Sequence, residues 1–394
     1  MKRLLAILIV CMVTAVPVLA QQPTVSLLTF YPGSEIYELE GHTALRVTDD
    51  RGDTAFNWGT FDFLTPGFVY RFVKGETDYM VAAAPTDLFL SYYAGSGRRV
   101  VEQRLNLTES QTAELIRLID INMRPENRVY RYNYVLDNCA TRPLNLIEQA
   151  SGDTISLAPH AGSGKTFRQS MRHYHSAYPW YQFGIDMALG SGIDRPVSNR
   201  EKAFAPVDLM EMLDSALVND GHGHFVPLVA SRHVLVEGQP GGASLPPTPW
   251  WLTPLFWSWA VFALTLAVTW RDYRRRRLSR WADTLLFGLL GIAGLLLTFL
   301  IFVSVHEATS PNWLYLWINP MCLFIAAGVW IKKWSDAVYW WQIVNFALVL
   351  ILGILGVIGV QSLNAAFWPL MLSDIMRSMI YIYLYRCNAI RQFH

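Results

Sequence analysis

The pattern of hydrophobic and polar positions divides this chain into two unlike halves. From residue 21 to residue 245, apolar residues alternate with polar ones or recur at helical spacing, as in a globular domain with one core. From residue 250 to residue 386, apolar residues form long runs that each approach the ~20 residues needed to cross a bilayer. These runs are roughly 250–270, 282–304, 313–331, 338–360 and 366–385. The pattern predicts an α+β domain followed by a five-helix transmembrane bundle over residues 250–386.

The first twenty residues have the pattern of a secretory signal peptide. A basic Met1–Arg3 precedes an apolar stretch from Leu4 to Val18, and the small residue Ala20 then provides a cleavage site. An uncleaved membrane anchor is the alternative. With either reading, the sequence predicts that the domain over residues 21–237 is exported.

Positive charge is distributed unevenly between the apolar runs. The loop 271–280, the pair Lys332–Lys333 and the tail 387–394 carry arginine or lysine, whereas the loops 306–310 and 361–365 carry none. By the positive-inside rule, the basic loops and the C-terminal tail are cytoplasmic. The glycines at positions 288, 291 and 294 predict close packing between helices. A Gly- and Pro-rich segment, 238–249, is expected to link the two halves.

Overall charge and cysteine content narrow the function classes. The 394 residues have a formal net charge of +1, which gives no reason to expect a nucleic-acid partner. Of four cysteines, Cys11 lies in the signal peptide, and Cys322 and Cys387 lie in or beside membrane spans. Cys139 is then the one cysteine of the exported domain, which therefore has no disulfide framework.

Local patterns predict the elements of the exported domain. A turn at 49–52 joins two alternating runs into a hairpin, and Thr108 opens a helix with a capping box to Gln111. The aromatic segment 59–73 is open to three interpretations, namely core, an apolar groove or a face that rests on lipid. The expected strands are 25–30, 40–47, 54–58, 100–107 and 128–135, and the expected helices lie within 144–150, 167–181 and 206–213.

Cys139 has the sequence context of a reactive thiol. It precedes a predicted helix. Because a proline is unfavourable inside a helix but tolerated in its first turn, Pro143 indicates that this helix begins near Arg142, with Cys139 on the turn before it. The positive end of a helix favours the thiolate, which is the nucleophile. His42, on a predicted hairpin strand after a glycine, offers a base. A buried, inert cysteine is the competing interpretation. Two histidines at 222 and 224 lack a nearby third ligand, so neither a metal nor a cofactor is expected.

The chain order, a histidine on a strand and then an Asn–Cys pair at a helix start, resembles the circularly permuted members of the NlpC/P60-like, papain-like superfamily. A closer resemblance is to the Lnb-type N-terminal periplasmic domain. The matching blocks are Pro32–Tyr37, Gly41–Val47, Asn57–Phe63, Glu102–Thr108, Pro125–Arg128, Asp137–Arg142 and Gly184–Ser191. Glu40 departs from the family pattern, in which an aromatic residue is expected before the Gly–His pair.

The resemblance implies a lipoprotein N-acyltransferase without cofactor, in the bacterial inner membrane. Cys139 would take an acyl chain from a membrane phospholipid as a thioester and pass it to the α-amine of a diacylated apolipoprotein. His42 would serve as base, oriented by Asn57 or, as the runner-up, Asp62. Asn138, Arg142 and His306, together with Asp62, are the expected substrate-binding residues. Backbone N–H groups at the helix start would form the oxyanion site.

Two other functions remain open at this stage. A thiol hydrolase of the same superfamily, acting on phospholipid esters or cell-wall peptides, would need the same Cys139 and His42. A cell-wall peptidase has no need of five spans, whereas a phospholipase differs only in whether water or an amine takes the acyl group. A non-catalytic exported binding domain on a membrane scaffold would leave Cys139 inert.

Overall fold

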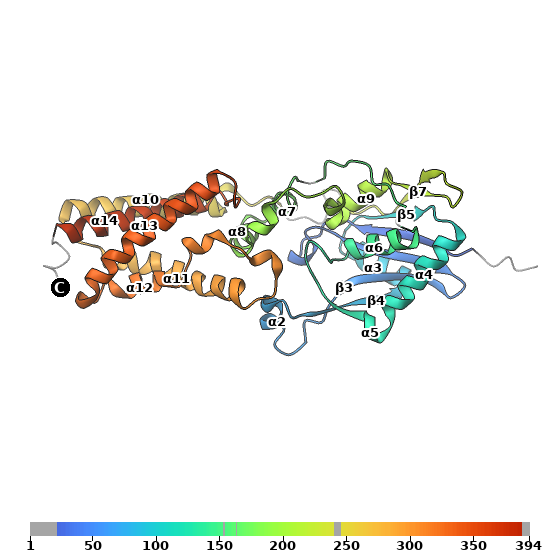
Figure 1. Cartoon of the computed structure of the whole chain (residues 1–394), viewed down its shortest axis with the longest axis horizontal. Coiled ribbons are helices and arrows are strands. Elements are labelled where there is room, and N and C mark those ends of the chain that lie inside the picture. Colours follow the sequence, from blue (N-terminus) through green and yellow to red (C-terminus); the bar gives the residue numbers. More distant parts are fainter. Residues whose placement is uncertain (1–21, 153, 163, 240–245, 388–394) are drawn as a thin grey trace, which may run out of the picture.

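The computed structural model describes residues 22–152, 154–162, 164–239 and 246–387. The predicted signal peptide 1–20, half of the linker (240–245) and most of the C-terminal tail lie outside these residues. A sheet domain forms one end of an elongated molecule and a helical bundle forms the other (Figure 1). The predicted α+β domain followed by a helical region is therefore confirmed.

The sheet domain is built on seven antiparallel strands in the order β6-β4-β3-β2-β1-β5-β9. The predicted hairpin is present, and it pairs Ala44 on β2 with Asn57 on β3. The strands are β1 Thr24–Phe30, β2 His42–Asp49, β3 Gly52–Thr60, β4 Asp78–Pro85, β5 Val100–Leu105, β6 Val129–Arg131 and β9 Val229–Val236. A separate pair consists of β7 Leu217–Asn219 and β8 Phe225–Pro227.

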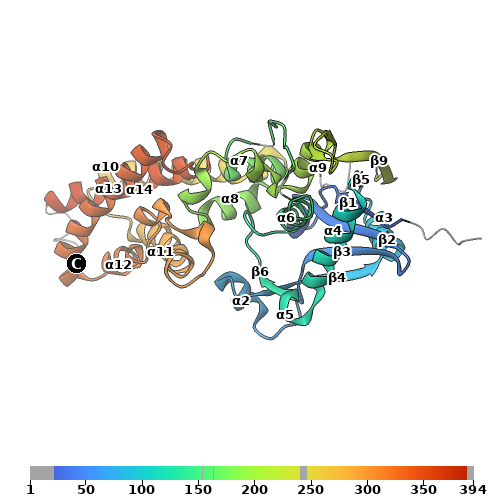
Figure 2. The ribbon, with the colours of Figure 1, turned by 45° about the vertical axis from the view of Figure 1, so that its right-hand side comes forward.

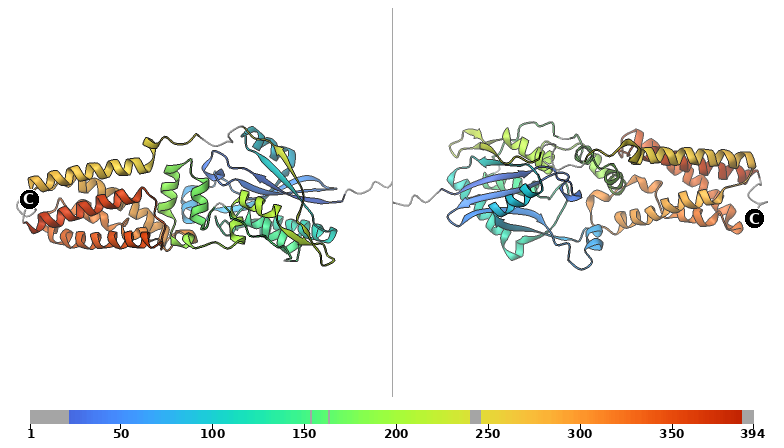
Figure 3. Two further views of the ribbon diagram at one scale, coloured as in Figure 1. Left: turned by 90° about the horizontal axis from the view of Figure 1, so that it is seen from above. Right: turned by 180° about the vertical axis from the view of Figure 1, so that it is seen from behind.

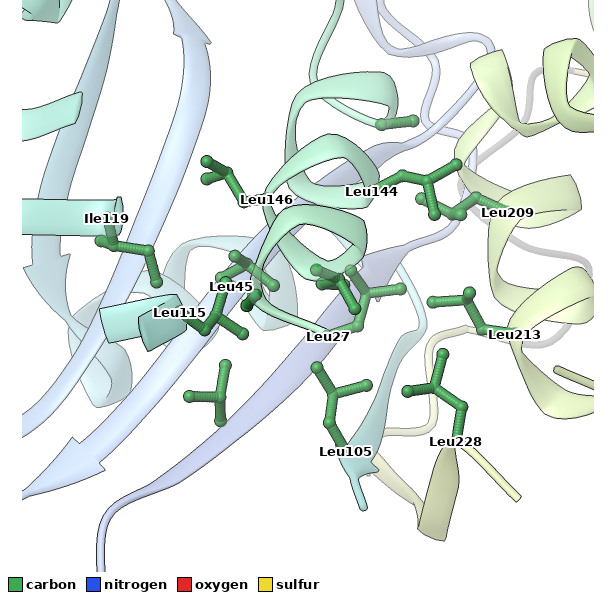
Figure 4. Packing of buried hydrophobic residues seen from close by; sticks show 14 of the residues in the cluster. Leu27, Leu45, Leu105, Leu115, Ile119, Leu144, Leu146, Leu209, Leu213 and Leu228 are labelled. Atoms are coloured by element: carbon green, nitrogen blue, oxygen red, sulfur yellow. The ribbon is translucent and has the colours of Figure 1, made fainter. Parts of the chain in front are cut away.

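Both faces of the central strands are covered by helices. On one face, α4 (Glu109–Met123), α6 (Thr141–Ala150) and α9 (Pro206–Asp214) pack against the sheet. Figure 4 shows Leu144 and Leu146 of α6 among leucines from the strands and from α9. On the other face, α3 (Thr86–Gly95) packs against residues such as Phe30. Burial on both faces explains why six of the seven residues of β1 are buried.

Two helices lie between the sheet and the bundle. They are α7 (Phe167–Tyr174) and α8 (Pro179–Ala188), and Figure 3 shows them at the junction. The buried Arg168 of α7 makes ion pairs with Asp186 (3.1 Å) and Asp194 (2.8 Å). Because a buried charge is tolerated only when it is paired, this cluster fixes the two helices to each other.

The bundle contains four long helices and one short one. They are α10 (Pro254–Arg275), α11 (Arg280–Phe302), α12 (Met321–Gly328), α13 (Ser335–Val357) and α14 (Phe367–Arg386). By length and composition, Arg280–Phe302 and Lys332–Val357 are sufficient to cross a membrane. Inside the bundle, Arg377 pairs with Asp272 (2.9 Å) and Asp283 (2.6 Å), which joins α14 to α10 and α11.

The third predicted span, 313–331, is wrong as a single helix. A 3-10 turn over Trp313–Leu316 is followed by a break at Pro320 and then by the eight-residue α12. Proline cannot donate a helical hydrogen bond, which accounts for the break. The prediction of close packing by glycine holds here, because a Cβ at Gly294 would lie 2.4 Å from the backbone of Asn319.

The loops at one end of the bundle are docked on the sheet domain. Asn133 donates to Glu307 (3.1 Å), Gly190 N–H donates to Ala308 (2.8 Å), and Arg172 donates to Ser362 (2.8 Å). These are the loops that carry no positive charge. The basic ends of α10 and α14 lie at the far end of the bundle (Figure 1).

Candidate active site

One cavity of about 500 Å³ contains the three residues to which the sequence assigns catalysis. Cys139, His42 and Asn57 all line it. They come from the turn before α6, from the start of β2 and from β3, so the hairpin and the helix together bring distant parts of the chain to one place. The cavity volume lies within the ~300–1,000 Å³ typical of ligand pockets.

The turn that carries Cys139 is held by its neighbour. The Asn138 side-chain oxygen accepts hydrogen bonds from the N–H groups of Ala140 (2.8 Å) and Thr141 (2.9 Å), and its amide donates to two carbonyls. Helix α6 begins at Thr141, so Cys139 lies on the preceding turn as Pro143 indicates. With its side-chain groups used in this way, Asn138 shapes the turn, and substrate binding by its side chain stays a prediction.

His42 is placed by a glycine that no other residue can replace without strain. Gly41 has a φ of +86°, and a Cβ there would lie 2.5 Å from the carbonyl oxygen of Phe30. The His42 Nε2 is hydrogen-bonded to the Asn57 side-chain oxygen. The Asn57 amide nitrogen donates to Thr60 (3.3 Å), which assigns the orientation of the amide. His42 therefore carries its proton on Nε2, and Nδ1 is left as the base.

Burial keeps both reacting groups uncharged in the resting protein. It lowers the pKa of His42 to about 4, a shift that the Asn57 hydrogen bond opposes. Burial also raises the pKa of Cys139 to about 11, although the Thr43 N–H and the Tyr132 hydroxyl favour the thiolate. Desolvation therefore opposes the thiolate that the helix end is expected to favour.

This electrostatic state predicts slow alkylation of Cys139 near neutral pH. A thiol with a pKa near 11 is protonated at pH 7, and its thiolate fraction rises about tenfold per pH unit up to that pKa. Iodoacetamide labelling, followed by peptide mass spectrometry between pH 6 and 10, should show this slope at Cys139. The exposed Cys387 provides an internal comparison. Rapid labelling of Cys139 at pH 7 would instead indicate a preformed thiolate.

The geometry also predicts a partial loss of activity in Asn57→Ala. Without the side-chain oxygen, His42 loses the partner that selects its tautomer, and we expect kcat to fall about 10- to 100-fold. The matched control is Asn106→Ala. Asn106 is exposed just after the last residue of β5, donates to the Pro227 carbonyl and does not line the cavity. Unchanged turnover in Asn57→Ala would remove Asn57 from the catalytic group.

Of the other predicted site residues, some line the cavity and some do not. His306 lines the cavity and is hydrogen-bonded to the Phe72 carbonyl (2.9 Å). Asp62 is exposed and accepts from the N–H of Leu64, outside the cavity lining. Arg142 pairs with Asp137 (2.6 Å) and is also outside the lining. The structure thus places His306, but not Asp62 or Arg142, beside the three catalytic candidates.

The aromatic segment 59–73 forms part of a groove, which is one of its three interpretations, and its contact with lipid stays a prediction. Phe61, Phe63 and Phe72 line the cavity, as a groove requires. Other side chains of the segment point away from the fold, since Leu64 is 89% exposed and Val69 is 73% exposed. Helix α2 (Phe68–Lys74) lies on the bundle side of the sheet domain (Figure 2), and Val305 donates to the carbonyl of Lys74 (2.8 Å). The cavity therefore reaches the place where the bundle begins.

Sequence reasoning missed two charged residues of the cavity, Glu38 and Arg98. Arg98 is buried, donates to the Tyr31 carbonyl (2.7 Å) and pairs with Glu38 (2.8 Å). The Glu40 side chain also lines the cavity. The departure of Glu40 from the family pattern was the one signal that pointed to it.

Among the residues that the structure describes, one group has the spacing of metal ligands. Ligand atoms of His160, Asp208 and Glu211 all lie within 4.8 Å of one another. None of the three lines the cavity. The histidines at 222 and 224 do not join such a group.

Comparison with known families gives two matches that together cover most of the chain. Residues 18–171 match the Lnb N-terminal periplasmic domain, and residues 247–388 match the Lnb transmembrane domain. No curated protein and no solved structure matches the chain significantly. One match falls in each of the two halves that the hydrophobic pattern separates.

Proposed function

Because the chain belongs to the Lnb family, and is thus a membrane protein with a periplasmic domain, we propose that it is a lipoprotein N-acyltransferase. It takes an acyl chain from a membrane phospholipid and transfers it to the α-amine of the N-terminal diacylglyceryl-cysteine of apolipoproteins. The bundle lies in the bacterial inner membrane, with the sheet domain in the periplasm and the C-terminus in the cytoplasm. The basic ends of α10 and α14, distal to the sheet domain, support this orientation.

The single observation that carries the proposal is the shared cavity. It is lined by Cys139, His42 and Asn57, and also by Phe72 and by His306 from a loop of the bundle. Both proposed substrates are lipids of the bilayer. The cavity is rich in aromatic side chains and lies next to the membrane helices. A phospholipid could therefore bring its ester group to the nucleophile while part of the lipid stays in the bilayer.

In the first step, the Cys139 sulfur attacks the ester carbonyl of the phospholipid while its proton passes to His42 Nδ1. The carbon–oxygen bond of the ester breaks, and the imidazolium returns the proton to the departing lysophospholipid oxygen. The Cys139 thioester and neutral His42 remain. Asn57 holds the Nε2 proton throughout and steadies the imidazolium as it forms.

In the second step, the acceptor amine attacks the thioester carbonyl. The new carbon–nitrogen bond forms as the carbon–sulfur bond breaks, and the proton that the nitrogen loses passes through His42 to the sulfur. The product is an amide, and Cys139 is again a neutral thiol, which its raised pKa favours. Because the free Cys139 thiolate is poorly stabilised, it is a poor leaving group. The departure of the sulfur is therefore the step that most needs a proton from His42.

The first step can be tested by isolating the acyl-enzyme. The purified full-length protein, mixed with phosphatidylethanolamine vesicles without acceptor, should carry one acyl chain on the Cys139 peptide and release an equal amount of lysophospholipid. The Cys322 and Cys387 peptides in the same digest are the controls. Release of free fatty acid in place of a stable thioester would favour the phospholipase alternative. Acylation at another residue, or none at all, would contradict the proposal.

A further inference from the structure

Glu40 presents a carboxyl group to the cavity from the position two residues before His42. Its side chain is only 11% exposed, and it lines the same cavity as Cys139. Its Oε1 is buried without a hydrogen-bond partner among the described residues. A buried carboxyl is costly unless a cation or a proton compensates it. The fold therefore maintains an uncompensated acidic group beside the nucleophile.

The groups around Glu40 do not supply a cation. The titratable groups that face it are Tyr134, Tyr181, His175, Asp208 and Cys139. Tyr134 is within hydrogen-bonding reach, and Asp208 adds negative charge. The His175 Nε2 lies 3.7 Å from the carboxyl, but burial lowers the pKa of His175 to about 4, so it is neutral at pH 7.

His175 is also oriented so that it cannot donate to Glu40. Its Nδ1 is hydrogen-bonded to the side-chain oxygen of Gln182 (2.9 Å), which places the proton of the neutral ring on Nδ1. The Nε2 that faces Glu40 then carries a lone pair. Burial accordingly raises the pKa of Glu40 to about 8. Among the described residues, Tyr134 offers the carboxyl a hydrogen bond, but no cation is found beside it.

We propose that Glu40 binds the α-ammonium group of the acceptor and takes its proton, which selects an amine over water for the second step. This inference rests on the proposed function and adds the residue that recognises the acceptor. Arg98 of the same cavity is paired with Glu38, so an ammonium group would supply the cation that Glu40 lacks, and its hydrogens can fill the unused Oε1. Water carries no charge and gains nothing comparable from the carboxyl.

The proton balance of the step is complete. The ammonium binds to ionised Glu40, whose pKa falls because an opposite charge now lies beside it. One proton then moves from nitrogen to the carboxyl, which leaves a neutral amine that can attack the thioester. The second nitrogen proton passes through His42 to the Cys139 sulfur as the amide forms. Glu40 finally releases its proton to solvent.

The test compares wild-type protein with Glu40→Gln, which keeps the shape of the side chain. Two acceptors are offered to the preformed Cys139 thioester: a synthetic diacylglyceryl-cysteine peptide with a free α-amine, and hydroxylamine, which is uncharged at neutral pH. In Glu40→Gln, transfer to the peptide at pH 7 should fall about 10- to 100-fold. Thioester formation and cleavage by hydroxylamine should stay within about twofold of wild type.

The pH profile separates recognition from a structural effect. In Glu40→Gln, only acceptor that is already neutral can react, so transfer to the peptide should rise about tenfold per pH unit up to the α-amine pKa. The wild-type profile should be flatter. Glu35→Gln, an exposed position on the same loop, is the matched control and should behave as wild type.

Each outcome has a distinct meaning. If Glu40→Gln transfers to the peptide at the wild-type rate and with the wild-type profile, the role of Glu40 is wrong while the acyltransferase proposal stands. An equal fall with both acceptors would also contradict it, since that pattern indicates a damaged site. If wild-type protein forms no thioester at Cys139, the proposed function itself fails.

Discussion

Replacing Cys139 with alanine should abolish acyl transfer, with a fall of at least about 10⁴-fold. No other described cysteine lines the cavity, and without the sulfur neither the thioester nor the second step can form. Turnover is measured as triacylated peptide formed from phospholipid vesicles and a diacylated acceptor. The variant should remain folded in the membrane, because hydrogen bonds to sulfur, here from the Tyr132 hydroxyl at 3.9 Å and from the Thr43 N–H, are weak.

The matched control for this substitution is Cys322→Ala, which removes a buried thiol from the bundle. We expect it to retain most of the activity, since Cys322 lies on α12, outside the cavity lining. Cys139→Ser is informative as well. A serine hydroxyl is a poorer nucleophile, and we expect it to be nearly as inactive as alanine. Retained transfer in Cys139→Ala would exclude the thioester route.

Substitution of His42 by alanine should reduce turnover by about 10³-fold or more. The neutral thiol cannot lose its proton to solvent at a useful rate when its pKa lies near 11, so the base has a large share of the catalysis. The residual rate should rise with pH, because hydroxide can then generate the thiolate. The measurement is kcat between pH 6 and 10 in the same vesicle assay.

A control histidine is available in the same domain. His224 is exposed in a turn beside Asp220, away from the cavity, so His224→Ala should leave kcat and its pH dependence unchanged. If His42→Ala retained most of its activity, or lost it without a new pH dependence, His42 would not be the base that serves Cys139.

Much of the fold was predictable where local patterns were strong. The hairpin of β2 and β3 has its turn at the expected place, and Thr108 caps α4 with the expected capping box. Strand β4 was not predicted, because a run such as Ala82–Ala84 has little β propensity and depends on its neighbours β3 and β6. Strand β9 was also missed. It is an edge strand that pairs with β5 from more than a hundred residues away, and local pattern carries no such information.

The candidate site divides in a similar way. The sequence predicted that Cys139, His42 and Asn57 lie close together, because the hairpin positions His42 and Asn57 and the helix start positions Cys139. It did not predict their charge states, since burial of the cavity depends on side chains such as Tyr132 and Phe204 from distant segments. For the same reason Arg142 was assigned to substrate, whereas its guanidinium lies 3.4 Å from the Tyr130 ring centre and pairs with Asp137.

The most direct test of the central claim is the mass of a lipoprotein N-terminus. The lipoprotein is produced in cells that lack any other N-acyltransferase and that contain either this protein or its Cys139→Ala form at equal membrane levels. The account predicts a third acyl chain, on the α-amine, only with the unaltered protein. A free α-amine with both proteins would contradict acyl transfer and direct attention to fatty-acid release from phospholipid. A third chain with both would contradict the role of Cys139.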